Sequence, residues 1–389
     1  MLAIARARSV GHRGDLPDLR LANIQAMLAP DEAAISYFWL TDTTILVLLV
    51  DENHCHAERI NLQPAQRHAL DEFLAKIQQI SAVSSNSRPK AWHAMDNVFA
   101  PLGAILFPAF CQDFIRGKKR VILSPNQGLH LFPFHATRCD GEFLGVFYAV
   151  RYVPNLGSLL LRWNGYSEGG VLAIGVPECY VGNYGAVANA ADEVEQIRQC
   201  YEARGVPVDV LIGENATRGR IEQMRTEGKL QSYRCVHLAT HGVSVFESPV
   251  EPMESRLLLY RSELDSMDIA ELELRAEIAV LSACNSGQRA FARGTEELAG
   301  DDIFGLQQAL FQSGVRTVLG SLWPVASESA QMIVAAFHRH FAAGETAEVA
   351  LQYAVTEYLQ HADWQFIYYW APFFLTSLGS VAPSHPTPF

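Results

Sequence analysis

The sequence predicts an α/β protein with a mostly parallel sheet and helices on both of its faces. From residue 170 onward, short β-branched apolar segments alternate with segments of helical length and periodicity. The segment Val171–Val176 is apolar without polar alternation, which is typical of a strand buried on both faces. Hydrophobic residues make up 49% of the 389 residues and charged residues only 19%, which excludes disorder for most of the chain.

The N-terminal part shows a different order of elements. Two segments rich in β-branched and aromatic residues flank the turn Thr41–Thr43 and predict a pair of strands. The polar stretch Ser81–Lys90 predicts a loop between two helices. The expected elements are a helix over 16–28, strands over 34–40 and 44–50, helices over 64–80 and 92–107, and a strand over 120–123.

The second part follows a regular alternation. We expect strands over 171–176, 208–212, 233–239, 276–283, 316–323 and 371–377, and helices over 189–204, 217–228, 296–312, 327–341 and from 346 onward. Because the pattern changes near residue 170, we place an accessory part over 1–165, a second domain over 166–380 and a tail over 381–389.

Charge and cysteine usage exclude several classes of protein. The net charge of −12 argues against nucleic acid as a partner. Apolar runs such as Ile45–Val50 are too short to span a membrane, and no signal peptide is visible. The seven cysteines form no CxxC pair and predict free thiols in a reducing, cytoplasmic setting. His54, Cys55 and His56 have no second ligand pair, so we expect no metal and no cofactor.

Reactive side chains follow two of the expected buried strands. His241 and Gly242 follow the strand 233–239, and Cys284 follows the strand 276–283. If these strands are parallel neighbours, both residues lie at the same carboxyl edge, where ligands bind in such sheets. A thiol there can attack a carbonyl carbon while an imidazole moves the proton. The N–H groups of Gly242 and Cys284 would then form an oxyanion hole. The alternative is that each residue is only structural.

Several motifs resemble one family in the same order. They are His237-Leu-Ala-Thr-His-Gly, Leu281-Ser-Ala-Cys-Asn-Ser-Gly and Gly320-Ser-Leu-Trp-Pro-Val. Together with Leu123-Ser-Pro-Asn-Gln-Gly and Tyr369-Trp-Ala-Pro-Phe, they resemble the CHAT family of caspase-like peptidases. The resemblance covers roughly residues 30 to 378. It implies a doubly wound caspase-like sheet between helices, preceded by an inactive protease-like half.

The resemblance implies a cysteine endopeptidase of the caspase, separase and gingipain class, with His241 as catalytic histidine and Cys284 as nucleophile. In that fold the strand after the nucleophile's helix lines the substrate subsites. Ser321, Leu322 and Trp323 are therefore candidate substrate-binding residues, although core packing explains Trp323 equally well. Some relatives carry an acid two positions before the cysteine, but here that position is Ser282, so no basic P1 preference follows.

Asp301 and Asp302 are further candidates for substrate binding. Acids at the start of a helix are also favoured by the helix dipole alone, so both explanations stay open. One rival motif, the G-x-S-x-G run around Ser167, precedes a strand instead of following one, which is the wrong order for a nucleophile elbow.

The expected partners are a protein substrate, from family context a gasdermin-like or other neighbouring gene product, and an activator protein in a bacterial defence or regulated-proteolysis pathway. No membrane partner is expected. The alternative function is a catalytically silent caspase-like scaffold or interaction module.

Overall fold

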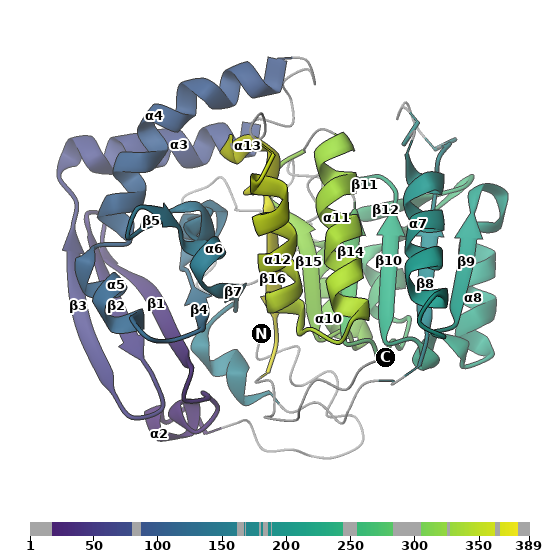
Figure 1. Cartoon of the computed structure of the whole chain (residues 1–389), viewed down its shortest axis with the longest axis horizontal. Helices are drawn as coiled ribbons and strands as arrows, with labels where there is room; N and C mark the ends of the chain where they lie inside the picture. Colours follow the sequence, from purple (N-terminus) through teal and green to yellow (C-terminus); the bar gives the residue numbers. More distant parts are fainter. Residues whose placement is uncertain are drawn as a thin grey trace.

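A computed structural model describes residues 18–79, 87–161, 167, 169–178, 180–181, 186–187, 189–243, 255–282, 305–324, 327–361 and 366–379. Cys284, Asp301 and Asp302 lie outside these described residues. The fold is the expected α/β fold, a large and mostly parallel sheet flanked by helices (Figure 1).

The N-terminal part begins with a short helix and an antiparallel meander, and three helices follow. The expected helix over 16–28 is described only as one turn and a half, because Leu21–Gln25 alone has helical geometry and none of its residues is buried. The elements are α2 (Leu21–Gln25), β1 (Glu32–Thr41), β2 (Thr44–Val50), β3 (Cys55–Asn61), α3 (Pro64–Gln79), α4 (Arg88–Leu106), α5 (Ala109–Ile115), β4 (Arg120–Ser124), β5 (Arg138–Cys139), β6 (Glu142–Phe143), α6 (Leu144–Phe147) and β7 (Ala149–Tyr152).

The second part alternates strands and helices, as its apolar pattern predicts. Its elements are β8 (Val171–Gly175), α7 (Ala190–Glu202), β9 (Val208–Ile212), α8 (Arg218–Thr226), β10 (Cys235–Ala239), β11 (Gly242–Val243), β12 (Arg256–Leu259), β13 (Ser262–Asp265), α9 (Ser266–Ala270), β14 (Ile278–Ser282), α10 (Leu306–Ser313), β15 (Thr317–Ser321), α11 (Ser327–Ala342), α12 (Ala347–Leu359), α13 (Ile367–Trp370) and β16 (Phe373–Ser377).

One sheet contains strands from both parts, in the order β3-β2-β1-β4-β7-β16-β15-β14-β10-β8-β9. The strands β1, β4, β7 and β16 are mutually parallel, and so are β15, β14, β10, β8 and β9. The two blocks meet at β15 and β16, which pair antiparallel. The last described strand, β16, therefore joins the two parts edge to edge.

Helices cover both faces of the sheet. The largest core cluster packs α7 and α11 on one face of the sheet, includes α12 beside β7 and β16, and continues under α3, α4 and α5 of the N-terminal part. A second cluster packs α8, α9 and α10 on the opposite face. Figure 1 shows α7, α11 and α12 together on one side of the sheet, with α13 close to α3 and α4.

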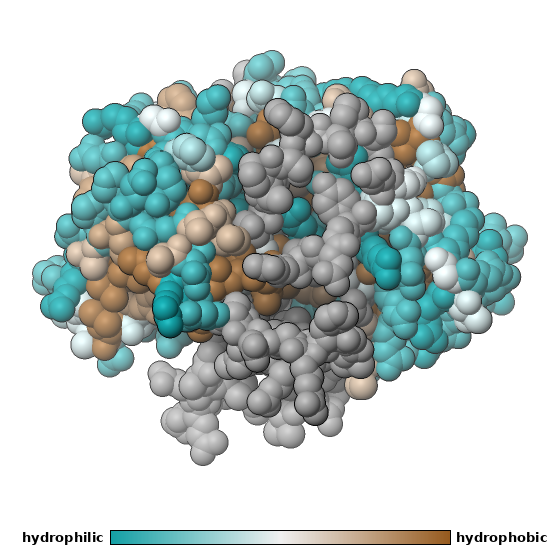
Figure 2. Space-filling view, turned by 90° about the horizontal axis from the view of Figure 1, so that it is seen from below, coloured by the Kyte–Doolittle hydropathy of each residue, from teal (hydrophilic) through white to brown (hydrophobic). Residues whose placement is uncertain are grey.

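On the opposite face of the N-terminal block, the hydrophobic core is smaller. Its cluster holds few residues, and Ile24, Met27 and Leu48 are only partly buried there. Leu19 and Leu21 are 67% and 44% exposed. Figure 2 shows apolar surface on this side of the molecule, among largely hydrophilic surroundings.

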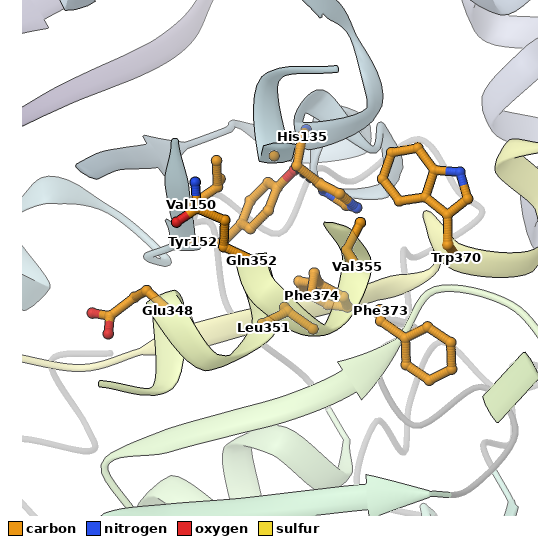
Figure 3. A pocket seen from close by; sticks show the side chains of 11 residues that line it. His135, Val150, Tyr152, Glu348, Leu351, Gln352, Val355, Trp370, Phe373 and Phe374 are labelled. Carbon is orange, nitrogen blue, oxygen red and sulfur yellow. Dashed lines mark hydrogen bonds between the residues drawn. The ribbon is translucent and has the colours of Figure 1, made fainter. Parts of the chain in front are cut away.

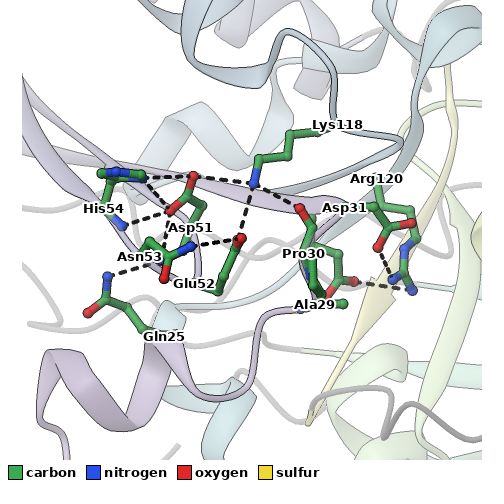
Figure 4. Close-up of polar contacts among 11 residues, drawn as sticks. Gln25, Ala29, Pro30, Asp31, Asp51, Glu52, Asn53, His54, Lys118 and Arg120 are labelled. Carbon is green, nitrogen blue, oxygen red and sulfur yellow. Dashed lines mark hydrogen bonds and ion pairs between the residues drawn. The ribbon is translucent and has the colours of Figure 1, made fainter.

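Ion pairs connect the β2–β3 turn with the segment that precedes β4 (Figure 4). The Lys118 ammonium lies 3.2 Å from Asp51 and 3.1 Å from Glu52, and it donates to the carbonyl of Pro30 at 2.9 Å. Burial raises the pKa of Asp51, but N–H groups of Asn53 and His54 and the ammonium of Lys118 outweigh it and lower that pKa to about 2. The carboxylate of Asp51 therefore stays charged and fixes the β2–β3 turn to β4.

Among the described residues, no single helix is long and apolar enough to cross a membrane. Met95–Leu106 and Ala109–Ile115 meet the length and composition criterion only as a pair, across a bend of 65°.

Candidate functional site

The candidate site lies at the carboxyl edge of β10 and β14. These two strands are parallel neighbours, and their register runs from Cys235 opposite Ile278 to Ala239 opposite Ser282. His241 follows Ala239 by two residues, and Cys284 follows Ser282 by two residues. The strand arrangement that the sequence predicts is thus present up to the last described residue of β14.

The backbone around His241 is held by a small second sheet. The hydroxyl of Thr240 donates to the carbonyl of Leu258, and the N–H of Leu258 donates to the carbonyl of His241 at 3.0 Å. Gly242 then pairs with Leu257 in the three-stranded sheet β11-β12-β13. Both sides of His241 are therefore anchored to β12, while its own side chain is only partly buried.

The support of β12 is itself well fixed. The turn between β12 and β13 bonds to the β9–α8 connection, where the N–H of Tyr260 donates to the carbonyl of Ala216 at 2.9 Å. At the end of β13, Asp265 and Asp268 form a reciprocal capping box that begins α9. Because β12 is held at both ends by these hydrogen bonds, it limits the positions that the backbone of His241 can occupy.

The strand β15 borders the site on its other side. Its residues pair with β14 on one edge and with β16 on the other, up to Ser321 opposite Phe373. The N–H of Leu322 donates to the carbonyl of Pro372 at 2.9 Å. Residues 317–319 are therefore paired on both edges, whereas the pairing of β15 with β14 ends at Leu319 opposite Val280. The expected pairing of substrate with this part of the chain stays a prediction.

Trp323 has the contacts of a core residue. It is fully buried, its indole stacks on Trp92 with ring centroids 4.1 Å apart, and its N–H donates to the carbonyl of Tyr368 at 3.0 Å. Ser321 and Leu322 are also buried, at 4% and 2% exposure. Of the two explanations for Trp323, core packing accounts for these contacts. A substrate role for Ser321, Leu322 and Trp323 stays a prediction.

Ser167 has a structural role in the connection before β8. Its hydroxyl donates to the carbonyl of Ser232 at 2.6 Å and accepts from the N–H of Gly169 at 3.0 Å. Its own N–H donates to the carbonyl of Arg275 at 2.9 Å. These bonds tie the connection to the core, which agrees with the position expected for Ser167 outside a nucleophile elbow.

Burial disfavours the thiolate form of four of the five described cysteines. Burial raises the pKa of Cys235 to about 12 and also raises the pKa of Cys111, Cys139 and Cys200, which disfavours the reactive thiolate. Cys55 is exposed on the edge strand β3. In the described ranges, no three His, Cys, Asp or Glu side chains converge as metal ligands, including those around Cys55.

A small cavity lies away from this site, at the junction of the two parts (Figure 3). His135 lines it, and its Nδ1 lies 2.8 Å from the Tyr152 hydroxyl while its Nε2 lies 2.9 Å from the carbonyl of Ala371. The carbonyl can only accept, so Nε2 carries the proton and Nδ1 accepts from Tyr152. Burial lowers the pKa of His135 to about 4. This imidazole joins the two parts and is not placed for acid–base chemistry.

Comparison with known proteins now identifies the family. The family model of the CHAT domain matches residues 96–380, more than two thirds of the chain. The chain belongs to the CHAT domain family. The match spans both the second block and the end of the N-terminal block, in agreement with one continuous sheet in this CHAT protein.

Two solved structures are similar to this CHAT protein. The separase of the Saccharomyces cerevisiae separase–securin complex superimposes with a TM-score of 0.56 at 12% identity, over 91% of this chain and 30% of that chain. The CHAT chain therefore spans about 30% of the separase, and the likeness shows a shared caspase-like fold. The Arg-specific cysteine proteinase gingipain R (RgpB) gives a TM-score of 0.42 at 9% identity, over 81% of this chain and 75% of that one. The comparison with curated proteins gives no match.

Some residues around the site escape prediction from the sequence. Thr240 stands beside His241, but its bond to Leu258 depends on a β-strand pairing 18 residues away. His237 is a polar residue in an otherwise apolar, buried strand, and this contrast in the sequence could have indicated a buried polar contact. Its partner His338 lies 101 residues further along the chain, which no local pattern indicates.

Proposed function

We propose that this CHAT protein is a cysteine endopeptidase that uses His241 and Cys284 as a dyad. The observation that supports the proposal most directly is the register of Ala239 opposite Ser282. Adjacent parallel strands lie about 4.8 Å apart. Because Ala239 and Ser282 end neighbouring strands at the same level, we expect the segments that carry His241 and Cys284 to begin side by side.

The proposed reaction is acyl transfer through the thiol of Cys284. The sulfur attacks the scissile carbonyl carbon and passes its proton to His241. The N–H groups of Gly242 and Cys284 bind the developing oxyanion, and His241 then protonates the amine as the C–N bond breaks. Water hydrolyses the resulting thioester and releases the acid product with a free thiol.

Burial of the other thiols supports the choice of nucleophile. Four of the five described cysteines have a raised pKa, and Cys55 stands on the far edge strand of the sheet. The proposal predicts that an electrophilic activity probe labels Cys284 at neutral pH. The Cys284→Ala variant should therefore lose this labelling, and the matched control Cys55→Ala should retain it.

His241→Ala separates the dyad from a merely reactive thiol. We expect this variant to lose cleavage of a peptide library by about two to four orders of magnitude, the usual contribution of general acid–base catalysis. Wild-type cleavage in His241→Ala or in Cys284→Ala would refute the dyad.

The alternative function is a catalytically silent scaffold. Absence of probe labelling and of cleavage, also with a candidate activator present, would favour it. Asp301 and Asp302 remain proposed specificity residues, and their alanine variants would change the preferred P1 residue if they bind the substrate.

The partners in this proposal are a protein substrate and an activating partner in the cytoplasm, in bacterial defence or regulated proteolysis. A gasdermin-like or other neighbouring gene product is the proposed substrate. Co-expression followed by N-terminal sequencing of fragments tests it. A set of neighbours that all stay intact would contradict it.

A further inference from the structure

Four buried side chains form a line between β10 and two helices. Glu193 Oε1 of α7 lies 3.0 Å from His237 Nε2 of β10. His237 Nδ1 lies 3.2 Å from His338 Nε2 of α11, and His338 Nδ1 lies 3.0 Å from the Tyr201 hydroxyl, again of α7. Tyr201 also hydrogen-bonds to the thiol of Cys235. The line therefore connects three elements of the second block.

One set of proton positions satisfies the hydrogen bonds between His237, His338 and Tyr201. If His338 is neutral, its Nε2–H donates to His237 Nδ1, so a neutral His237 carries its proton on Nε2, which lies 3.0 Å from Glu193 Oε1 but outside hydrogen-bond geometry. His338 Nδ1 then accepts from the hydroxyl of Tyr201, which can accept from Cys235. The donors of this set therefore run in one direction, from Tyr201 through His338 to His237.

The line cannot hold two further protons. Two imidazolium rings would place His237 Nδ1–H against His338 Nε2–H at 3.2 Å, with two donors and two positive charges facing each other. Both imidazoles have no exposed surface, and Glu193 is only 6% exposed. Burial and the neighbouring His237 lower the pKa of His338 well below its usual value. Buried charges of like sign at this distance are strongly unfavourable.

Other charged groups on the surrounding elements are paired elsewhere. At the start of β10, Arg234 bonds to Glu277 at 2.6 Å. On the outer side of α11, Arg339 and His340 both pair with Glu357 of α12. On the inner side of α12, Glu348 pairs with Arg151 at 3.4 Å, and the Tyr358 hydroxyl donates to Ser329 of α11. Among these described groups, Glu193 is the carboxylate in direct contact with the histidine pair.

We propose that the Glu193–His237–His338–Tyr201 line is an acid-sensitive latch that fastens α7 and α11 to β10. At neutral pH the hydrogen bonds from Tyr201 through His338 to His237, together with the Glu193 carboxylate 3.0 Å from His237, hold the three elements together. Acid protonates the histidines of open molecules and so favours opening. Because His241 follows β10 directly and Glu193 lies in the first turn of α7, the latch supports the same carboxyl edge as the candidate site.

The direction of the effect follows from proton linkage. An unfolded histidine has a pKa near 6.5, whereas His338 stays neutral in the folded protein. Unfolding therefore takes up a proton below about pH 6.5. The stabilisation is fully present above that pH and is lost as the pH falls, with up to about a tenfold increase in the unfolding constant per pH unit for each such histidine.

The test compares His338→Gln with His340→Gln in urea unfolding between about pH 7.5 and 4.5. Glutamine keeps one donor and one acceptor but does not titrate. We expect His338→Gln to reduce the pH dependence of the unfolding constant by up to about tenfold per pH unit below pH 6.5. His340→Gln, two positions along the same helix, removes a half-buried imidazole that pairs with the exposed Glu357, and it should change that dependence much less.

A measurement on the wild type keeps the proposal testable if His338→Gln does not fold. Imidazole 15N chemical shifts report which ring nitrogen carries the proton. A neutral Nε2–H tautomer of His338 that persists below pH 6 is the expected result. A folded-state pKa near 6.5 for His338, or equal pH dependence in His338→Gln and wild type, would overturn the latch. Neither measurement depends on proteolytic activity.

Discussion

The indole of Trp92 stacks on the indole of Trp323, with ring centroids 4.1 Å apart and planes inclined by 26°. Trp92 belongs to α4 of the N-terminal part, and Trp323 follows β15 of the second block. The hydroxyl of Tyr368 donates to the carbonyl of Pro324 at 3.0 Å and fixes the same segment. The N-terminal part thus supports the chain that leaves the sheet beside the candidate site.

Truncation of Trp92 should destabilise the whole molecule. Trp92 is fully buried, so Trp92→Ala should cost about 3–5 kcal/mol of unfolding free energy, and Trp92→Phe clearly less. Urea unfolding measures both. Trp39→Ala is the control, because Trp39 is only partly buried and its ring contacts Arg67. Equal losses for Trp92→Ala and Trp39→Ala would contradict a central role of the stack.

Loss of the Thr240 hydroxyl should loosen the backbone beside His241. Thr240→Val keeps the shape of the side chain but leaves the carbonyl of Leu258 without this donor, at a cost of about 1–3 kcal/mol. Thr240→Ser keeps a hydroxyl and should restore the bond. We expect lower probe labelling of Cys284 in the valine variant, measured where both variants are fully folded. Wild-type labelling in Thr240→Val would separate this bond from the site.

The strands of the second block could be predicted from the sequence because burial on both faces leaves a continuous apolar run. β8 and β10 are buried throughout, and their expected positions agree with the structure. β3 was missed because it is an exposed edge strand. Only Ile60 is buried in it, and pairing with β2 specifies it instead of apolar content. Polar residues in an edge strand look like a loop in the sequence.

Strand direction and distant contacts could not be predicted. β16 reads as an apolar strand like its neighbours, yet it runs antiparallel to β15, because direction depends on the path of the chain through α12 and α13. The two strand ends that precede His241 and Cys284 were predictable, and β10 and β14 are parallel neighbours as expected, whereas the Cys–His dyad itself stays a prediction. The support of His241 by Leu258 was not predictable, since that contact depends on how β12 folds back along the strand end.

Arg151 should be essential for joining the two parts. The buried guanidinium lies 3.6 Å from Glu32 and 3.4 Å from Glu348, and it donates to the carbonyl of Gly379 at 3.3 Å. Arg151→Met would leave two buried carboxylates without this partner, which costs about 3–5 kcal/mol in comparable sites. Arg198→Met, which removes an exposed helix pair, is the control and should leave the unfolding midpoint nearly unchanged.

Restoration in a double variant would confirm the cause of that loss. Arg151→Met combined with Glu348→Gln removes one stranded charge, so part of the lost stability should return. A single variant no less stable than Arg198→Met, or a double variant with simply additive losses, would show that the ion pairs around Arg151 contribute little.

His135 should make the junction of the two parts sensitive to acid. Its folded-state pKa is lowered to about 4 by burial, whereas an unfolded histidine titrates near 6.5. Below pH 6.5 the unfolded chain therefore binds the additional proton, and stability falls until about pH 4. The difference corresponds to about 3 kcal/mol at most. His135→Gln removes this proton uptake and should flatten the pH dependence of urea unfolding between pH 6.5 and 4. His68→Gln, at an exposed position of α3, should not. An unchanged pH dependence in His135→Gln would mean that the imidazole protonates freely in the folded protein, which its contacts with Tyr152 and the carbonyl of Ala371 argue against.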